Sequence, residues 1–323
     1  MQVRPPQPVV ILFLIDVTSA AIQSGMLAIA ADTILRNLRN IPDADGRARV
    51  GFITFDASLH FYNLAAGLTD PEMMIVSDLE DPFLPVPCDL LVPLGECRAT
   101  IETFLGRLPR LHGTSHIAIS VLGKALKFAE KLIAPIGGKI VVFQHALPNQ
   151  DAGMLKPRED PKLFGTPKEV SLLQPAIPYY KNIAVECSPS QVSIDMFLFS
   201  SAYADLATLS GCAKFTGGNV FYYPKFNAAM PEDAMKFSHE LGHLLSRPLG
   251  LEAVLRVRAS NGIKMTAFHG NFFLRSTDLL SLPNVNPDNS YAIELAINEN
   301  LTTPTVCFQA ALLHTSSTGI ICF

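Results

Sequence analysis

The sequence lacks the patterns of a disulfide-bonded or membrane-spanning protein. Its six cysteines include no CxxC pair, so neither a disulfide framework nor a cysteine zinc site is indicated, and a reducing compartment fits best. No uncharged apolar run approaches the roughly 18 residues needed to cross a bilayer. The run VVILFLI at 9–15 imitates a signal peptide, but it is short and ends at Asp16. We therefore expect a protein without a membrane span.

Charge of either sign is also sparse. Charged residues make up 17% of the 323-residue chain and hydrophobic residues 49%, which excludes general disorder and predicts a large core. The net charge of −4 provides no overall attraction to nucleic acid, so no nucleic-acid partner is expected. Lys and Arg are missing altogether from Val50 to Cys97, a span that holds eight Asp or Glu residues. This span predicts an acidic face or loop.

Motifs of nucleophilic and phosphate chemistry are missing as well. There is no GxSxG elbow and no phosphate-binding loop. Residues 16–20, Asp-Val-Thr-Ser-Ala, approach the DxSxS pattern of a magnesium site, but Ala20 has no oxygen to offer. Asp16 is better explained as a strand-end carboxylate whose hydrogen bonds are satisfied, and Thr18 as a helix cap. These absences predict no catalytic and no cofactor-binding residue.

The first part of the chain alternates strand and helix patterns up to about residue 248. PPQPVVILFLIDV becomes a continuous apolar run, which is typical of a strand buried on both faces of a sheet. Strands alternating with helices imply an α/β domain, expected over residues 1–248, with a mostly parallel sheet covered by helices on both sides. Strands are expected at 9–15, 49–56, 58–64, 137–147, 192–200 and 219–224, and helices at 20–41, 94–108, 117–133, 167–186, 203–214 and around HELGH.

The pattern changes at Leu251. From there, short segments alternate or run apolar at strand lengths, with a turn signal at Asn261-Gly262. We expect a partial β-sandwich over residues 249–323, which stops before an obvious closing strand. Its strands are expected at 251–259, 263–270, 290–298 and 306–314.

HELGH, at 239–243, fits the HExxH pattern of a zinc metallopeptidase. In that hypothesis His239 and His243 bind the metal and Glu240 activates a water molecule. A third ligand is required, and no HxxGxxH continuation supplies one. His269 and Glu294 remain open as third ligands, whereas Glu252 is too near in the sequence.

The orientation of this helix argues against the zinc hypothesis. At 100° per residue, Phe237, Leu241 and Leu244 form one apolar stripe together with Leu245, and this stripe should face the sheet. The two histidines lie almost opposite, toward solvent or toward the second domain. We therefore predict a structural helix with no metal-binding residue, and keep a zinc metallopeptidase as the alternative.

Long, ordered segments resemble a known family. The chain is closely similar to the cargo-adaptor subunit of the COPII coat, the Sec24 family, in the segments RPPQPVVILFLIDV, GFITFDASLHFYNL, MMIVSDLEDPFLPVPCDLLVPL, GGKIVVFQHALPNQDAGML, FTGGNVFYYP and FHGNFFLRSTDLLSLP. The paralogous GTPase-activating coat subunit is less similar, because the acidic stretch that ends in DLEDPFLPVP is typical of the cargo adaptor.

The resemblance implies a von Willebrand A-like trunk at 9–246 and part of a β-sandwich at 250–323. It implies a protein without enzymatic activity that binds the sorting signals and cytosolic tails of membrane cargo, including SNARE proteins. The implied coat partner is the GTPase-activating subunit of the inner coat. The implied location is cytoplasmic, peripheral on the endoplasmic reticulum membrane and the COPII vesicle coat. Because the family's zinc ribbon lies upstream of this chain, no cofactor is expected in it.

The resemblance also implies cargo-binding residues. Arg256 and Arg258 are similar to positions in the family's pocket for acidic, Leu-rich export signals, and Leu313 is similar to its apolar wall. The residues themselves fit this role, because two arginines two apart on a strand leave the same face, while Leu255 and Val257 enter the core. Paired guanidinium groups hold carboxylates through charge-assisted hydrogen bonds. The alternative is a merely solvated strand face.

A second pocket of the family, used by another class of cargo, contains one arginine. Arg47 or Arg49, in DGRARV, resembles that residue. The alternative is that both arginines only solvate a loop before a strand, since exposed arginine is the common case.

Overall fold

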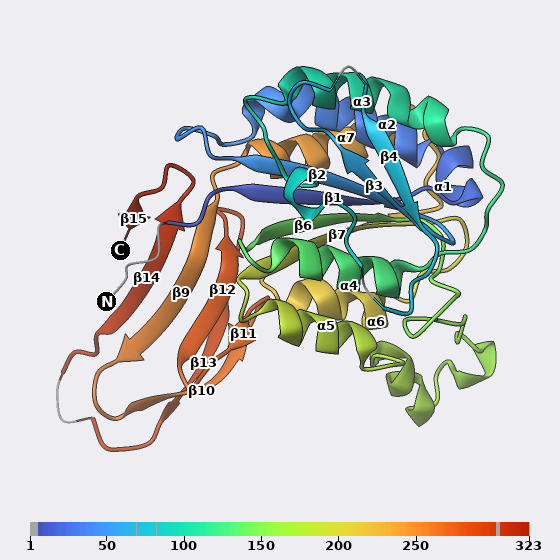
Figure 1. Ribbon diagram of the computed structural model, residues 1–323. Coiled ribbons are helices and arrows are strands. Elements are labelled where there is room, and N and C mark those ends of the chain that lie inside the picture. Colours follow the sequence, from blue (N-terminus) through green and yellow to red (C-terminus); the bar gives the residue numbers. More distant parts are fainter. Residues whose placement is uncertain (1–5, 69, 82, 302–303, 323) are drawn as a thin grey trace.

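A computed structural model describes residues 6–322 except 69, 82, 302 and 303. The outer ends of the two predicted domains, residues 1–5 and Phe323, lie outside the described residues. The chain forms an α/β layered body with a set of antiparallel strands packed at one end (Figure 1). We call these two parts the trunk and the sandwich.

The trunk is built on an eight-stranded mixed sheet with the order β4-β3-β2-β1-β6-β7-β8, and β5 pairs with β2. Strands β2, β1, β6, β7 and β8 run parallel to one another, whereas β3 and β5 pair antiparallel with β2, and β4 pairs antiparallel with β3. Every residue of β1, β6 and β7 is buried, which confirms the predicted sheet covered on both sides. The strands are β1 (Val10–Asp16), β2 (Arg49–Phe55), β3 (Leu59–Asn63), β4 (Glu72–Val76), β5 (Val92–Pro93), β6 (Gly138–Gln144), β7 (Val192–Ser200) and β8 (Val220–Pro224).

Helices cover the two faces of this sheet and bury a hydrophobic cluster on each. One layer consists of α1 (Ser19–Gln23), α2 (Met26–Asn37), α3 (Arg98–His112) and α7 (Pro231–Ser246), the other of α4 (Leu122–Ile133), α5 (Tyr179–Cys187) and α6 (Leu206–Lys214) (Figure 1). Short 3₁₀ turns lie at Leu38–Asn40, Pro87–Asp89, Pro161–Leu163 and Pro167–Leu173. Across the described ranges, no helix is both long and apolar enough to span a bilayer.

Two of the predicted helices are interrupted, and the one expected over 117–133 begins only at Leu122. The helix expected over 20–41 is broken at Gly25, whose φ of 78° is left-handed and whose missing Cβ would come within 2.5 Å of the Ala228 Cβ. The helix expected over 167–186 is a 3₁₀ turn followed by α5, because Pro175 and Pro178 interrupt it. Strand β4 was not predicted at all.

The sandwich contains a five-stranded antiparallel sheet, β11-β12-β9-β14-β15, and a separate two-stranded ribbon, β10-β13. Its buried core is small and consists of Ala253, Leu282 and Val285, with partly buried neighbours such as Leu255. Strand β12 was missed because Pro283 interrupts its sequence pattern. The strands are β9 (Gly250–Ala259), β10 (Ile263–His269), β11 (Phe273–Leu274), β12 (Leu279–Val285), β13 (Ala292–Ile297), β14 (Phe308–Ser316) and β15 (Ile321–Cys322).

Candidate binding surfaces

Arg256, Arg258 and Leu313 share one face of the five-stranded sheet. In the antiparallel register of β9 and β14, Arg258 lies opposite Gln309, Arg256 opposite Ala311 and Val254 opposite Leu313. Residues that lie opposite or two apart in a sheet project from the same face, so both guanidinium groups and the leucine side chain point the same way. The predicted alternation along β9 is therefore confirmed. Leu255 packs on the sandwich core, although Val257 is only half-buried.

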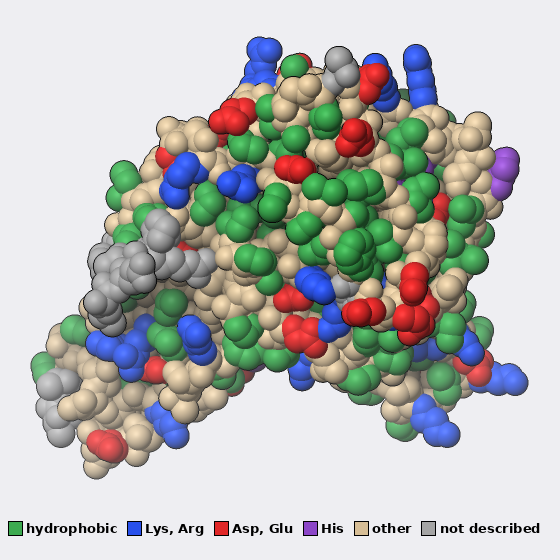
Figure 2. Space-filling model, in the orientation of Figure 1, with side chains coloured by type: hydrophobic (Ala, Val, Ile, Leu, Met, Phe, Trp, Pro, Cys, Tyr) green, Lys and Arg blue, Asp and Glu red, His purple; other side chains and the backbone are tan. Residues whose placement is uncertain are grey.

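The two arginines line a shallow depression of about 380 Å³ on this face. We call it the arginine face and define it by Arg256, Arg258, Lys264 and Asp278. Figure 2 shows Lys and Arg side chains gathered on the sandwich, at the lower left of the view. Leu313 is 37% exposed on the same face of the sheet but does not line the depression. The side chains here form a cationic surface with an apolar neighbour.

Arg256 already has a carboxylate partner. Its Nε donates to Asp278 Oδ2 at 2.8 Å, and both side chains are partly exposed. Asp278 directly precedes β12, and residue 279 pairs with Arg256 in the ladder. Asp278 was not predicted because β12 was not predicted, and Lys264 was not predicted because it lies on β10, which pairs with β13 and not with β9.

Arg47 and Arg49 lie away from this depression, at the start of β2. Arg47 is held by its own chain, since its Nε and Nη2 contact Asp45 Oδ2 at 2.7 and 2.6 Å and its Nη1 donates to the Pro6 carbonyl oxygen at 3.0 Å. The turn at Gly319 of the sandwich lies close to the same guanidinium. Arg49 is half-buried. The role of these two arginines in a second pocket stays a prediction.

The predicted acidic span is a surface of the trunk. Six of its eight carboxylates are exposed, whereas Asp56 is buried and accepts a hydrogen bond from the Ser58 amide at 2.9 Å, and Asp89 is half-buried. Large apolar side chains are exposed among them, including Ile75 and Phe83. In the view of Figure 2, hydrophobic side chains spread over the trunk with acidic side chains between them.

The histidines of HELGH do not converge on a common centre. Phe237, Leu241, Leu244 and Leu245 are the buried residues of α7, as the helical wheel predicts. His243 Nε2 lies 2.8 Å from Asp288 Oδ2 of the sandwich, while the Glu240 carboxylate accepts a hydrogen bond from the Tyr223 hydroxyl. Among residues 6–322, apart from the four not described, no group of three His, Cys, Asp or Glu is placed to hold a metal ion. His269 and Glu294, the two candidate third ligands, pair with each other, with His269 Nε2 2.8 Å from Glu294 Oε1.

Asp16 is hydrogen-bonded within the trunk. Its Oδ1 accepts the Thr18 amide at 2.8 Å, and its Oδ2 accepts the amides of His145 and Ala146 at 2.9 Å each. Burial raises the pKa of this carboxyl above its usual value, although these donors oppose the effect. The predicted satisfied carboxylate is confirmed. Thr18 does occupy the N-cap position of α1, but its hydroxyl makes no capping hydrogen bond, so that part of the prediction is wrong.

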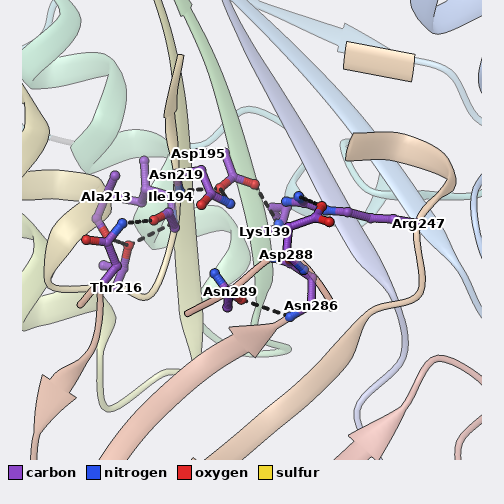
Figure 3. Close-up of polar contacts among 12 residues, drawn as sticks. Lys139, Ile194, Asp195, Ala213, Thr216, Asn219, Arg247, Asn286, Asp288 and Asn289 are labelled. Atoms are coloured by element: carbon purple, nitrogen blue, oxygen red, sulfur yellow. Dashed lines mark hydrogen bonds and ion pairs between the residues drawn. The ribbon is translucent and has the colours of Figure 1, made fainter. Parts of the chain in front are cut away.

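Two ion pairs lie where the trunk meets the sandwich, one buried and one half-exposed (Figure 3). Lys139 Nζ donates to Asp195 Oδ2 at 2.5 Å, and both side chains are almost fully buried. Asp195 Oδ1 also accepts the Asn219 amide at 2.7 Å. On the sandwich side, Arg247 Nη1 donates to Asp288 Oδ2 at 2.8 Å. Burial lowers the pKa of Lys139, opposed by Asp195.

Comparison with known proteins identifies both parts. A model of the Sec23/Sec24 trunk domain matches residues 6–245, and a model of the Sec23/Sec24 beta-sandwich domain matches residues 250–322. The chain belongs to the Sec23/Sec24 family. Together the two matches leave only a few residues at the ends and at the junction unaccounted for.

Individual relatives fall on the Sec24 side of the family. The chain is 53% identical over 320 residues to "Protein transport protein SEC24" of Chaetomium globosum and 52% identical to the "Protein transport protein sec24" of Aspergillus clavatus, with 98% of this chain aligned in each case. It covers 34% and 35% of those relatives, so it spans about a third of their length.

The solved structures agree. The crystal structure of the human COPII-coat protein Sec24c superposes with a TM-score of 0.93 at 33% identity, covering 98% of this chain and 43% of that chain. A von Willebrand factor type A protein from Catenulispora acidiphila superposes with a TM-score of 0.51 at 10% identity, over 95% of this chain and 62% of that one. The von Willebrand A-like fold of the trunk is thus confirmed.

Proposed function

We propose that this chain is the cargo-selecting part of a COPII coat adaptor, acting by binding and not by catalysis. One observation carries the proposal: Arg256, Arg258 and Leu313 lie on one face of the sandwich, in a chain whose relatives are named protein transport proteins. The ligands are sorting signals in the cytosolic tails of membrane cargo travelling from the endoplasmic reticulum to the Golgi.

The chemistry of the arginine face suits an acidic signal that contains leucine. A carboxylate binds a guanidinium group through paired, charge-assisted hydrogen bonds, and a leucine side chain of the signal packs beside Leu313. In the free protein, the Arg256 guanidinium is hydrogen-bonded to the Asp278 carboxylate. An incoming carboxylate replaces Asp278, so Asp278 competes with the signal and lowers its affinity.

The remaining assignments rest on the family. The GTPase-activating subunit is the proposed partner in the inner coat, SNARE proteins are among the proposed cargo, and the protein works in the cytoplasm, peripherally on the endoplasmic reticulum membrane and the vesicle coat. Arg47 or Arg49 is proposed for a second cargo pocket. No cofactor is assigned to this chain. Retention of the GTPase-activating subunit on the immobilised chain tests the partnership, and a failure to retain it at micromolar concentration contradicts it.

Binding of a labelled acidic peptide tests the arginine face. The probe is a decapeptide with a Leu-x-x-Leu-Glu core, and its matched control carries Gln in place of Glu. Fluorescence anisotropy should show that Arg256→Ala and Arg258→Ala each weaken binding at least about tenfold, the effect of losing one hydrogen bond to a charged group. Arg36→Ala is the matched control, because Arg36 is an exposed arginine of α2 that pairs with Asp32.

Asp278→Asn sharpens the test. If Asp278 competes with the peptide, this variant binds the probe several-fold more tightly, whereas an arginine face with no role in binding predicts no change. Equal affinity in the wild type, Arg256→Ala and Arg258→Ala overturns the assignment of the site. A second function, the zinc metallopeptidase, is not proposed, because no observation favours it.

A further inference from the structure

A larger hollow lies where the trunk meets the sandwich. Its volume is about 980 Å³, at the upper end of the range for ligand sites. Its trunk wall comes from α6, β8 and α7, and its sandwich wall from the end of β10, the residues that follow it and Asp288. It shares no lining residue with the arginine face. We call it the junction hollow.

The apolar part of the junction hollow is preformed. Phe215 and Phe221 line it from the trunk, and Phe268 and Phe272 from the sandwich, each half-buried. Phe221 stacks on the buried Phe197 ring with centroids 4.5 Å apart, so packing in the trunk core holds its ring in place. Four partly exposed aromatic rings facing one hollow offer contact area for an apolar or aromatic side chain.

The polar lining of the hollow carries both signs of charge, with Lys214 and Arg247 as cations and Glu240 and Asp288 as anions. The Glu240 carboxylate accepts a hydrogen bond from the Tyr223 hydroxyl. Arg247 is 7% exposed, and its Nε and Nη2 have no hydrogen-bond partner in the described part of the chain. The neighbouring carboxylate of Asp195 is already paired with Lys139, as Figure 3 shows. Only Asp288, through Nη1, balances the Arg247 charge among the ion pairs of the described residues. A buried guanidinium with unused donors favours a carboxylate.

Asp288 is a weak internal ligand for this position. Its side chain is 50% exposed and lies between β12 and β13, where it bridges Arg247 and His243. Hydrogen bonds from Arg247 and then from His243 lower the pKa of the Asp288 carboxyl, so it is anionic near neutral pH. Lys214 lines the hollow, and its ammonium group lies 5.9 Å from the centroid of the Phe215 ring.

We propose that the junction hollow is a second peptide site, which takes a peptide carboxylate next to an aromatic side chain. The carboxylate displaces Asp288 from Arg247 and His243, and the aromatic side chain packs among the four phenylalanine rings. Lys214 attracts the acidic peptide at the rim. This site is separate from the arginine face, and it stands or falls independently of the function proposed for that face.

The experiment uses the full chain carrying Arg256→Ala and Arg258→Ala, so that the arginine face is silent. The probe is a fluorescein-labelled heptapeptide, Gly-Ser-Phe-Glu-Phe-Ser-Gly, and its controls carry Gln in place of Glu or Ala in place of both Phe residues. Anisotropy should show saturable binding of the probe, with Kd raised at least about tenfold for either control.

Two variants in this background test the mechanism. Asp288→Asn should lower Kd at least about threefold. In the wild type, the molecules in which Asp288 is paired with Arg247 cannot bind the peptide carboxylate there, and the variant lacks this competing carboxylate. Lys214→Glu, an exposed position on α6, should raise Kd about tenfold through like-charge repulsion. Circular dichroism melting confirms that each variant is folded. If Asp288 only holds the sandwich against the trunk through its ion pair with Arg247, Asp288→Asn lowers the melting temperature and does not tighten binding.

Several results would overturn the proposal. Equal binding of the Glu and Gln probes excludes carboxylate recognition, and unchanged affinity in Asp288→Asn excludes displacement. Binding seen in the wild type but lost in the Arg256→Ala/Arg258→Ala background places the probe on the arginine face, in which case the junction site fails while the proposed function stands.

Discussion

The trunk and the sandwich differ in how their strands are buried. Strands β1, β6 and β7 of the trunk are buried at every residue, between two layers of helices. In the sandwich, β13 is exposed at five of six residues, and most of β14 is exposed as well. Both sheets are rich in apolar residues, so composition alone does not distinguish them. The difference comes from what covers each face.

The two parts also differ in the size of their cores and in how much of each sheet is exposed. The trunk holds a large packed core on each side of its sheet, so most of the buried apolar area of the molecule lies there. The sandwich has a core of few residues and presents its strand faces, including the arginine face, to its surroundings. In the proposed function, the arginine face therefore lies on the part with little core, next to a trunk whose large core makes it stable.

The largest expected effect distinguishes the two cores. Phe197 is fully buried and stacks on Phe143 and Phe221, so Phe197→Ala should lower the free energy of unfolding by about 3–5 kcal/mol. Phe308 of β14 is 55% exposed, and Phe308→Ala should change it by less than about 0.5 kcal/mol. Urea unfolding followed by circular dichroism measures both. A similar loss for the two variants would break the comparison.

A second effect concerns the buried ion pair of the trunk. Lys139→Met leaves Asp195 buried without its cation, and the free energy of unfolding should fall by about 3 kcal/mol. The double variant Lys139→Met/Asp195→Leu removes both charges and should recover much of that loss. Urea unfolding of the single and double variants measures the coupling. Additive losses would show that the two side chains do not depend on each other.

The trunk should also lose stability in mild acid. His112 donates to or accepts from Tyr62 and Thr54 in a buried cluster, and burial, assisted by the nearby His60, lowers the pKa of His112 to about 4. The unfolded chain has an ordinary histidine pKa near 6.5, so unfolding takes up a proton between these values. The contribution of neutral His112 to the free energy of unfolding is therefore present in full above about pH 6.5 and is lost as the pH falls toward 4.

The slope of the free energy of unfolding against pH, measured by urea unfolding, tests this prediction. Each such histidine contributes up to about 1.4 kcal/mol per pH unit to the fall in the free energy of unfolding between pH 6.5 and 4. His112→Asn should be less stable at pH 7 and show a smaller fall with acid than the wild type. An identical pH profile for the two proteins would mean that the pKa of His112 is not lowered in the folded state.

The smallest effect belongs to the exposed loop that holds Arg47. Its pair with Asp45 lies on the surface, where ion pairs contribute less than about 1 kcal/mol. Asp45→Asn should therefore leave the melting temperature within a few degrees of the wild type. The difference should be smaller still at high salt, because salt screens the ion pair. A loss comparable to that of Lys139→Met would mean that this loop supports the sandwich through Pro6 and the turn at Gly319.

Much of the fold could be predicted from the sequence, because buried parallel strands are continuous apolar runs and the apolar stripe of α7 has helical spacing. The failures depend on contacts far apart in the chain. The break at Gly25 is set by Ala228, two hundred residues away. Strand β12 contains Pro283, which hides it from a pattern based on propensity.

The candidate sites divide in the same way. The shared face of Arg256 and Arg258 follows from the two-residue period of a strand and needs no tertiary information. The carboxylates that pair with these arginines could not be predicted from the sequence. Asp278 reaches Arg256 through the register of β9 and β12, and Asp288 reaches Arg247 from the sandwich to the trunk. A helical wheel places His243 toward the second domain but does not identify its partner.

Photo-crosslinking tests most directly the claim that the sandwich binds and the trunk supports. The probe is the acidic Leu-x-x-Leu-Glu peptide with a photoreactive leucine analogue, and crosslinked residues of the full chain are mapped by mass spectrometry. The account predicts crosslinks in β9 and β14, around Arg256 and Leu313, that disappear in Arg256→Ala/Arg258→Ala. Crosslinks confined to the trunk, or unchanged in that variant, would contradict it.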